Sequence, residues 1–228
     1  MPFARYVALG DSMSSDHYPT CDVLGLDLPP AELKPLGAAA LLYRDLERDA
    51  PGIGFTNLTE DGAMIDDVLT EELARLGHDS NDPRILVTLT AGGNDLLDAL
   101  LAGRPLDSAV ARIRRQYTEL VATLREELPQ ARLMLTTVYD PTDGTGRLPG
   151  LELLGPLPLE HLDRFNGHVR DTALRTPGAA LADVHRHFLG HGLSAPEGER
   201  WYWARNLIEP SARGASEIRR VWLAAHDS

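Results

Sequence analysis

Cysteine and positive charge are scarce in this sequence, and each shortage excludes a class of protein. Cys21 is the only cysteine among 228 residues, which excludes an internal disulfide and a metal site made of several cysteines. Lysine and arginine number 22 against 34 aspartates and glutamates, so the net charge is −12. Because phosphate backbones and anionic membranes attract basic patches, we expect neither a nucleic acid nor an anionic membrane surface as a partner.

Long apolar runs are missing as well. No window approaches the roughly 20 apolar residues that cross a bilayer, and the first residues resemble a strand rather than a secretory signal. We therefore expect a cytoplasmic protein without a membrane span. What is present, 43% hydrophobic and 25% charged residues, is typical of a globular chain. At this length we expect one domain over residues 1–228 with a sizeable core.

Short apolar runs alternate with amphipathic segments along the chain. The runs predict strands at 5–9, 55–58, 85–89, 133–139 and 179–184. The amphipathic segments predict helices at 36–46, 64–76, 108–128, 160–174 and 211–225. Strands separated by helices imply right-handed crossovers, so we expect an α/β fold with a parallel sheet between two helix layers.

Two irregular stretches, about 14–35 and 141–158, are rich in Pro, Asp and Gly. Loops of this length inside a compact domain are usually functional or disordered. Both follow the carboxyl end of a predicted strand, which is where open α/β sheets bind their ligands.

The first predicted strand ends in Gly10-Asp11-Ser12. A serine at this place has its hydroxyl at the carboxyl edge of the sheet, where the free N–H groups of a helix start stabilise an oxyanion. The alternative is that Ser12 only caps a helix. Two more strand ends carry Asp61-Gly62-Ala63 and Gly92-Gly93-Asn94-Asp95. A glycine N–H or the Asn94 amide would suit a developing negative charge, although both segments also suit plain turns.

In order and spacing, these three segments resemble the first three sequence blocks of the SGNH (GDSL-like) hydrolase family. The segment 209–214, Glu-Pro-Ser-Ala-Arg-Gly, resembles the family's final block. The resemblance implies a flavodoxin-like three-layer sandwich whose five parallel strands lie in the order 2-1-3-4-5. It also implies Ser12 as nucleophile and an oxyanion hole made of the Ser12 N–H, the Gly62 N–H and the Asn94 side chain.

The final block departs from the family pattern. The family has Asp-x-x-His-Pro, in which histidine is the base and aspartate orients it, whereas this chain has Asn206-x-x-Glu209-Pro210. Serine is a weak nucleophile that needs an adjacent base. A glutamate with an ordinary pKa of about 4.3 is a poorer base than an imidazole at about 6.5.

One interpretation is that the base has moved to a histidine elsewhere. Three histidines, His185, His187 and His191, follow the last predicted strand at the same edge of the sheet. We favour His191, since two flanking glycines suit a tight loop at a cleft, with Glu209 fixing its tautomer. His17, shortly after Ser12, is a further candidate.

Two other interpretations remain open. Glu209 itself acts as the base if burial raises its pKa, or the chain is a ligand-binding protein whose catalytic site is impaired. A metal site formed by the three histidines and Asp183 is disfavoured, because the helical i, i+4 ligand spacing is absent.

These observations predict a serine esterase that needs no cofactor and no metal. Its substrate would be a small-molecule carboxylic ester, a small acyl group on an alcohol or sugar, cleaved through an acyl-enzyme on Ser12. The expected site residues are Ser12, Gly62, Asn94, His191 and Glu209. The oligomeric state stays open.

Overall fold

The computed structural model describes residues 3–25, 36–76, 82–149 and 155–226. Its centre is a five-stranded parallel sheet in the order β2-β1-β3-β4-β5, which confirms the predicted topology. The strands are β1 (Arg5–Gly10), β2 (Gly54–Asn57), β3 (Ile85–Thr90), β4 (Arg132–Thr136) and β5 (Ala179–Ala182). Each predicted strand is present, and β4 ends before the predicted position 139.

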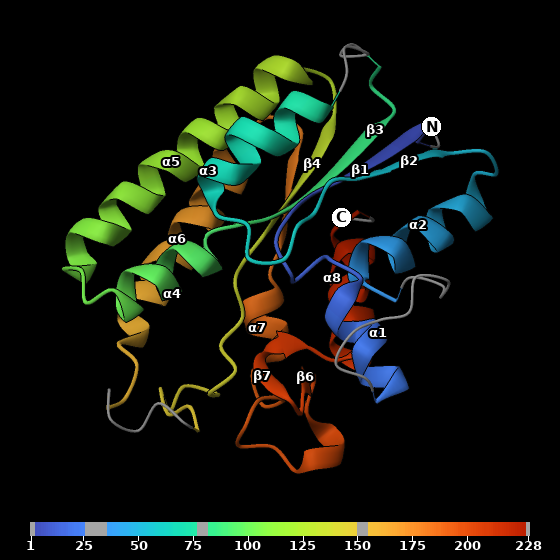
Figure 1. Ribbon diagram of the computed structural model, residues 1–228. Helices are drawn as coiled ribbons and strands as arrows, with labels where there is room; N and C mark the ends of the chain where they lie inside the picture. Colours follow the sequence, from blue (N-terminus) through green and yellow to red (C-terminus); the bar gives the residue numbers. More distant parts are fainter. Residues whose placement is uncertain (1–2, 26–35, 77–81, 150–154, 227–228) are drawn as a thin grey trace.

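Two layers of helices cover the sheet, as Figure 1 shows. One layer contains α3 (Ile65–Asp67), α4 (Gly93–Leu101), α5 (Leu106–Glu127) and α6 (Leu159–Arg175). The other contains α1 (His17–Leu24), α2 (Ala38–Asp49) and α8 (Ala212–His226). The described helices include none that is both long enough and apolar enough to cross a membrane.

The alternation of side chains along β1 divides the core in two. Val7 and Leu9 join the cluster under α5 and α6, whereas Tyr6 and Ala8 join the cluster under α2 and α8. A strand covered on both faces needs an uninterrupted apolar sequence. For this reason β1 and β3 could be predicted from the sequence. β1 and β3 pair from Arg5–Ile85 to Gly10–Thr90, so their carboxyl ends stop side by side.

Several elements differ from the prediction. α1 lies within the stretch 14–35 expected to be irregular, and α4 begins directly at the Gly92-Gly93 turn. The predicted helix 64–76 divides into α3, a π-helical turn η1 (Val68–Glu72) and a 3-10 turn η2 (Leu73–Arg75). Within the second irregular stretch, residues 141–149 form turns. Parts of both stretches, 26–35 and 150–154, lie outside the described residues.

The chain after β5 also contains elements that the sequence pattern does not predict. These are the short helix α7 (Val184–Phe188), a 3-10 turn η4 (Glu197–Glu199) and an antiparallel hairpin of β6 (Tyr202–Trp203) and β7 (Asn206–Pro210). The hairpin is too short to give an alternating pattern. It matters for the site because β7 ends at Glu209-Pro210, next to the start of α8.

Candidate active site

Ser12 lies just beyond the carboxyl end of β1, in a tight turn that a glycine makes possible. Gly10 has a φ of +118°, and a Cβ there would lie 1.7 Å from the carbonyl oxygen of Thr90 on β3. Only glycine fits this conformation and this close approach. The Asp11 carboxylate accepts a hydrogen bond from the Met13 N–H (3.1 Å), which closes the turn around Ser12. The serine side chain therefore sits at the sheet edge where the resemblance places a nucleophile.

Glu209 contacts Ser12 directly. The Ser12 side chain forms a hydrogen bond with the Glu209 carboxylate, and both residues are buried. The Tyr139 hydroxyl donates to the carbonyl oxygen of Ile208 (2.9 Å), which ties β7 to the segment that follows β4. Among the described residues, Oε2 of Glu209 has no hydrogen-bond partner. The Glu209 carboxylate is thus bonded to the serine side chain and also carries a buried oxygen without a partner.

Burial changes the acidity of Glu209. Desolvation raises the pKa of Glu209 to about 7, opposed by the hydrogen bond from Ser12 and assisted by the negative charges of Asp11 and Asp61. Desolvation likewise raises the pKa of Asp11 to about 6 and that of Glu72 to about 8. A carboxylate with a pKa near 7 is as basic as an imidazole. Glu209 can therefore accept a proton near neutral pH, as a catalytic base must.

Asn94 and Gly62 lie near the end of β1, close to the segment that contains Ser12. Asn94, in the first turn of α4, lines a cavity together with Ser12, and its Nδ2 donates to the carbonyl oxygen of Ala63 (3.0 Å). The Glu60 N–H donates to the carbonyl oxygen of Gly10 (2.9 Å), so the Asp61–Ala63 turn follows immediately beside the end of β1. Gly62 has a φ of +80° in this turn. Gly62 does not itself line the cavity, but its turn adjoins both Ser12 and Asn94.

The contacts that His191 makes are with residues other than Ser12. Its ring stacks on Trp201 with centroids 3.6 Å apart, and its Nδ1 lies 3.1 Å from the carbonyl oxygen of Glu199. The flanking glycines serve a different purpose from the expected one. The Asp143 carboxylate accepts hydrogen bonds from both of their N–H groups (2.9 and 3.0 Å), which ties this loop to the segment that follows β4.

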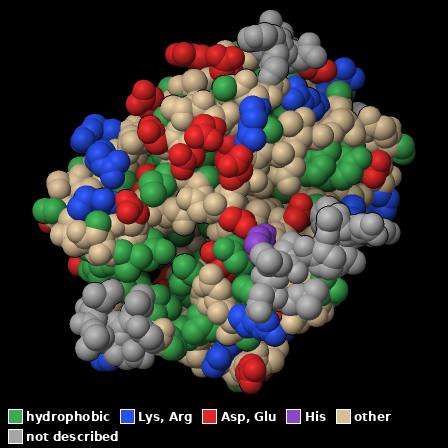
Figure 2. Space-filling view, in the orientation of Figure 1, with side chains coloured by type: hydrophobic (Ala, Val, Ile, Leu, Met, Phe, Trp, Pro, Cys, Tyr) green, Lys and Arg blue, Asp and Glu red, His purple; other side chains and the backbone are tan. Residues whose placement is uncertain are grey.

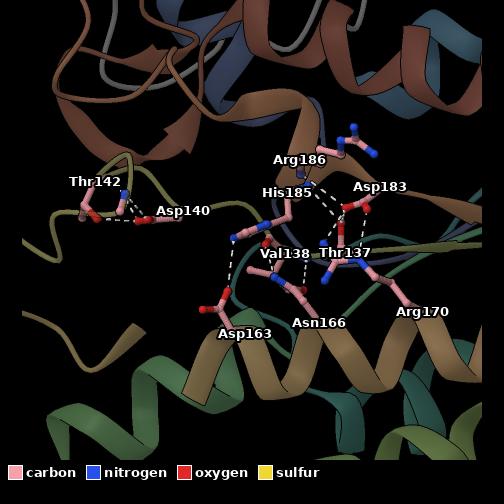
Figure 3. A network of polar contacts seen from close by, with 11 residues as sticks. Thr137, Val138, Asp140, Thr142, Asp163, Asn166, Arg170, Asp183, His185 and Arg186 are labelled. Atoms are coloured by element: carbon pink, nitrogen blue, oxygen red, sulfur yellow. Dashed lines mark hydrogen bonds and ion pairs between the residues drawn. The ribbon is translucent and has the colours of Figure 1, made fainter. Parts of the chain in front are cut away.

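The other two histidines after β5 also have partners of their own. His185 Nε2 lies 3.9 Å from Asp163 on α6, and the backbone N–H of His185 donates to Thr137 Oγ1, as Figure 3 shows. His187 Nε2 lies 2.8 Å from Glu217 on α8. The two rings thus point toward different helices. In the part of the chain that the structure describes, no group of three or more His, Cys, Asp or Glu side chains is arranged to hold a metal ion.

His17 lies nearer to the candidate site. It begins α1, and its Nδ1 lies 3.1 Å from Oδ2 of Asp61, the residue before Gly62. Tyr18 is the next residue along the chain. Burial, together with the negative charges of Glu209 and Asp61, raises the pKa of the Tyr18 phenol to about 12. His17 is therefore linked through Asp61 to the Gly62 turn, and we call Ser15, His17 and the Asp61–Ala63 turn the rim of the site.

The cavity next to Ser12 is mainly apolar, with a few polar side chains in its wall. It contains about 950 Å³ of empty space, part of it open to solvent. The polar or charged lining residues are Asp11, Ser12, Asn94, Asp140, His161 and Glu209. The apolar part is lined mainly by Leu96, Leu97, Leu100, Leu106, Val138, Leu148, Leu157, Leu159, Leu162 and Ile208. Figure 2 shows hydrophobic side chains gathered around a hollow in the lower left of this face.

Two residues near Ser12 were missed by the sequence analysis. Asp61 forms contacts to Ser15 and His17 that no local pattern indicates. Glu72 is 1% exposed, and its Oε2 accepts the Gly10 N–H (2.8 Å). A signal existed for Glu72, because it falls on the apolar stripe formed by Ile65, Val68 and Leu76. A charged residue on an apolar face indicates a buried carboxylate with a specific partner.

Comparisons with known proteins agree with this geometry. No curated protein matches the sequence. The chain is similar in structure to a phospholipase A1 from Streptomyces albidoflavus NA297 (21% identity, 98% of this chain and 99% of the other, TM-score 0.65). It is also similar to an extracellular lipase from Streptomyces rimosus (21%, 97% and 99%, TM-score 0.60) and an acetylxylan esterase from Geobacillus stearothermophilus (14%, 98% and 94%, TM-score 0.65). At these identities the likeness shows the fold.

The family itself follows from the sequence match. Residues 8–215 match the GDSL-like lipase/acylhydrolase family, and this span runs from within β1 to the first turn of α8. The chain therefore belongs to the GDSL-like lipase/acylhydrolase family, a family of ester-cleaving hydrolases.

Proposed function

We propose that the protein hydrolyses carboxylic esters through an acyl-enzyme on Ser12, with Glu209 as the general base. The observation that carries this proposal is the hydrogen bond between the Ser12 and Glu209 side chains, both of which line the cavity. A nucleophile and its base must be within hydrogen-bond reach, and the base must be poised near the working pH. Glu209 meets the second condition because burial raises its pKa to about 7.

The reaction follows from the positions of these two groups. Glu209 takes the Ser12 hydroxyl proton while Oγ attacks the ester carbonyl carbon, which gives a tetrahedral oxyanion. The protonated Glu209 then donates that proton to the leaving alcohol as the carbon–oxygen bond breaks, and an acyl-enzyme remains. Water attacks the acyl-enzyme, Glu209 accepts a proton from it, and the proton returns to Oγ as the carboxylic acid leaves.

The oxyanion would be stabilised by the Ser12 N–H, the Gly62 N–H and the Asn94 carboxamide. The contact of Asn94 with the Ala63 carbonyl oxygen supports this assignment, because it places the Asn94 side chain beside the Gly62 turn. Donors fixed in position before the reaction need no reorganisation when charge develops. Removing one such donor typically lowers kcat by roughly 10²- to 10³-fold.

The cavity favours an aliphatic acyl chain longer than the small acyl group expected from the sequence. Its leucine-rich walls offer apolar surface that an acetyl group would leave uncovered. Each methylene buried there contributes about 0.8 kcal/mol of binding free energy. The names of the structural neighbours include both lipid hydrolases and an acetylxylan esterase. The apolar lining of this cavity supports a substrate with a lipid-like acyl chain.

Two substitutions test the assignment. Ser12→Ala should abolish hydrolysis of a p-nitrophenyl ester and labelling by a fluorophosphonate probe. Glu209→Gln keeps the shape of the side chain but removes the base, so kcat should fall by roughly 10²- to 10⁴-fold. His191→Ala should retain wild-type turnover, because its ring stacks on Trp201.

Other results would redirect the assignment. Wild-type turnover in Glu209→Gln would exclude Glu209 as the base, and a large loss in His191→Ala would restore the histidine interpretation. If the wild-type protein is not labelled even at high probe concentration, the chain is a ligand-binding protein built on this fold.

A further inference from the structure

Asp61 connects the turn after β2 to the segment that begins at Ser12. Its Oδ1 accepts a hydrogen bond from the Ser15 hydroxyl, and its Oδ2 lies 3.1 Å from Nδ1 of His17. Ser15 is buried, and the Asp61 side chain is 28% exposed. Both partners of Asp61 belong to the segment that begins at Ser12, whereas Asp61 itself follows β2.

The turn that Asp61 begins is held on its other side as well. The Ala63 N–H donates to the carbonyl oxygen of Glu60 (3.2 Å), and the Asn94 amide donates to the carbonyl oxygen of Ala63 (3.0 Å). Gly62 lies between these two points with a φ of +80°, and a Cβ on it would meet no atom within 4 Å. No neighbouring atom therefore packs against Gly62 on this side, and the described contacts that hold the turn are made by its neighbours Asp61 and Ala63.

We propose that Asp61 is a positioning residue that locks the Gly62 turn against the Ser12 segment, through Ser15 and His17, and thereby fixes the Gly62 N–H for the oxyanion. Its catalytic part rests on the proposed function above. Because an oxyanion donor acts in the transition state and not on the bound ester, a loosened turn lowers kcat and leaves KM nearly unchanged. A misplacement of about 1 Å can lower the rate by about 10²-fold.

Holding the turn in place can be distinguished from an effect of the Asp61 charge on the pKa of Glu209. Ser15→Ala removes one contact and leaves every charge in place, whereas Asp61→Asn removes the charge and keeps an oxygen that accepts from Ser15. If Asp61 holds the turn in place, kcat falls most in Asp61→Ala and less in Ser15→Ala. Asp61→Asn then keeps part of the kcat that Asp61→Ala loses. If Asp61 acted only through its charge, Ser15→Ala would match the wild type and Asp61→Asn would match Asp61→Ala.

The experiment combines ester kinetics with hydrogen exchange of the backbone amides over residues 58–64. We expect kcat to fall by about 10- to 100-fold in Asp61→Ala, with KM within twofold of wild type and faster exchange in this segment. The matched control is Asp66→Asn, an exposed aspartate on α3, which should leave both measurements unchanged.

Two results would overturn the inference. They are wild-type kcat in Asp61→Ala, and a fall in kcat without faster exchange at 58–64. The exchange measurement does not depend on turnover. If the wild-type chain hydrolyses no ester, the proposed function fails and the catalytic part of this inference fails with it, while exchange still decides whether Asp61 holds the turn.

Discussion

At the scale of single residues, Glu209 illustrates how burial changes the role of a side chain. In water a glutamate is too acidic to be an effective base at neutral pH, since its ordinary pKa is about 4.3. At the end of β7 it is buried beside Asp11, and these surroundings raise its pKa to about 7. The sequence alone showed a carboxylate where a histidine was expected. The environment that makes the carboxylate comparable to a histidine comes from β1, β7 and the Asp61 turn together.

This shift predicts the pH dependence of ester hydrolysis. Glu209 must be ionised to accept the Ser12 proton, and a raised pKa keeps it protonated up to about pH 7. We therefore expect kcat/KM to rise about tenfold per pH unit below pH 7 and to level off above it. The measurement is kcat/KM for a p-nitrophenyl ester between pH 5 and pH 9.

A histidine base would give a similar curve, so a variant must separate the two. His17→Gln removes the histidine at the rim of the site and should keep the midpoint near pH 7. In Glu209→Gln the residual activity should lose this dependence. An activity that stays constant from pH 5 to pH 9 in the wild-type protein would contradict a Glu209 base of raised pKa.

At the scale of elements, the sequence predicts the strands that are buried on both faces and the helices that bury one continuous stripe. β3 is buried at all six positions, and α5 buries Val110, Ile113, Tyr117 and the apolar residues that continue this stripe. The stripe of α5 is a helical period, and the short apolar run of β3 has the length of a strand, so length and period together identify both elements. Ser12 and Asn94 could be placed because each follows a strand or turn of this kind.

The elements around the rim were harder to predict because nonlocal contacts hold them. α1 contains a proline in its first turn, where proline is tolerated but is easily mistaken for the mark of a loop. Asp16, just before α1, accepts the N–H of Gly37 (2.8 Å) across 21 positions of sequence. The contacts of His191 were hard to predict for the same reason, since its loop is organised by the distant Asp143.

α4 allows a prediction about the length of the acyl chain. Leu97 lines the cavity, whereas Leu101 on the same helix is 59% exposed and lies outside it. Leu97→Trp fills part of the cavity, so the preference of kcat/KM should shift toward shorter acyl chains by roughly one decade for an octanoyl relative to an acetyl ester, about 1.4 kcal/mol. The measurement is kcat/KM over a series of p-nitrophenyl esters from two to twelve carbons.

Leu101→Trp is the matched control and should keep the wild-type preference. If Leu97→Trp and the wild type prefer the same chain length, the leucine-lined cavity does not hold the acyl group.

At the scale of the whole molecule, three carboxyl groups are buried together at the carboxyl end of β1. Asp11, Glu72 and Glu209 are each less than a tenth exposed, and desolvation raises the pKa of each above its ordinary value. Such a group is bound more tightly to its proton in the folded chain than in the unfolded chain. Its contribution to stability is present at low pH and is lost as the pH rises toward the folded pKa. The candidate site therefore lowers stability at the pH at which its base is ionised.

Glu72 gives the clearest test, since its pKa is raised to about 8 and it does not contact the substrate cavity. Glu72→Gln keeps an oxygen for the Gly10 N–H and removes the group that must ionise. Below about pH 4.5 the variant and the wild type should be nearly equally stable. Toward pH 8 the variant should become more stable, by on the order of a few kcal/mol in the free energy of unfolding.

Urea unfolding at pH 4.5, 6 and 8 measures this difference, with Glu71→Gln as the control. Glu71 is the exposed neighbour of Glu72 in η1, so removing its charge should give a difference that hardly changes with pH. A Glu72→Gln difference that is equally independent of pH would show that Glu72 does not gain a proton on folding. The buried carboxyl groups would then not explain how the fold holds a basic Glu209 beside Ser12.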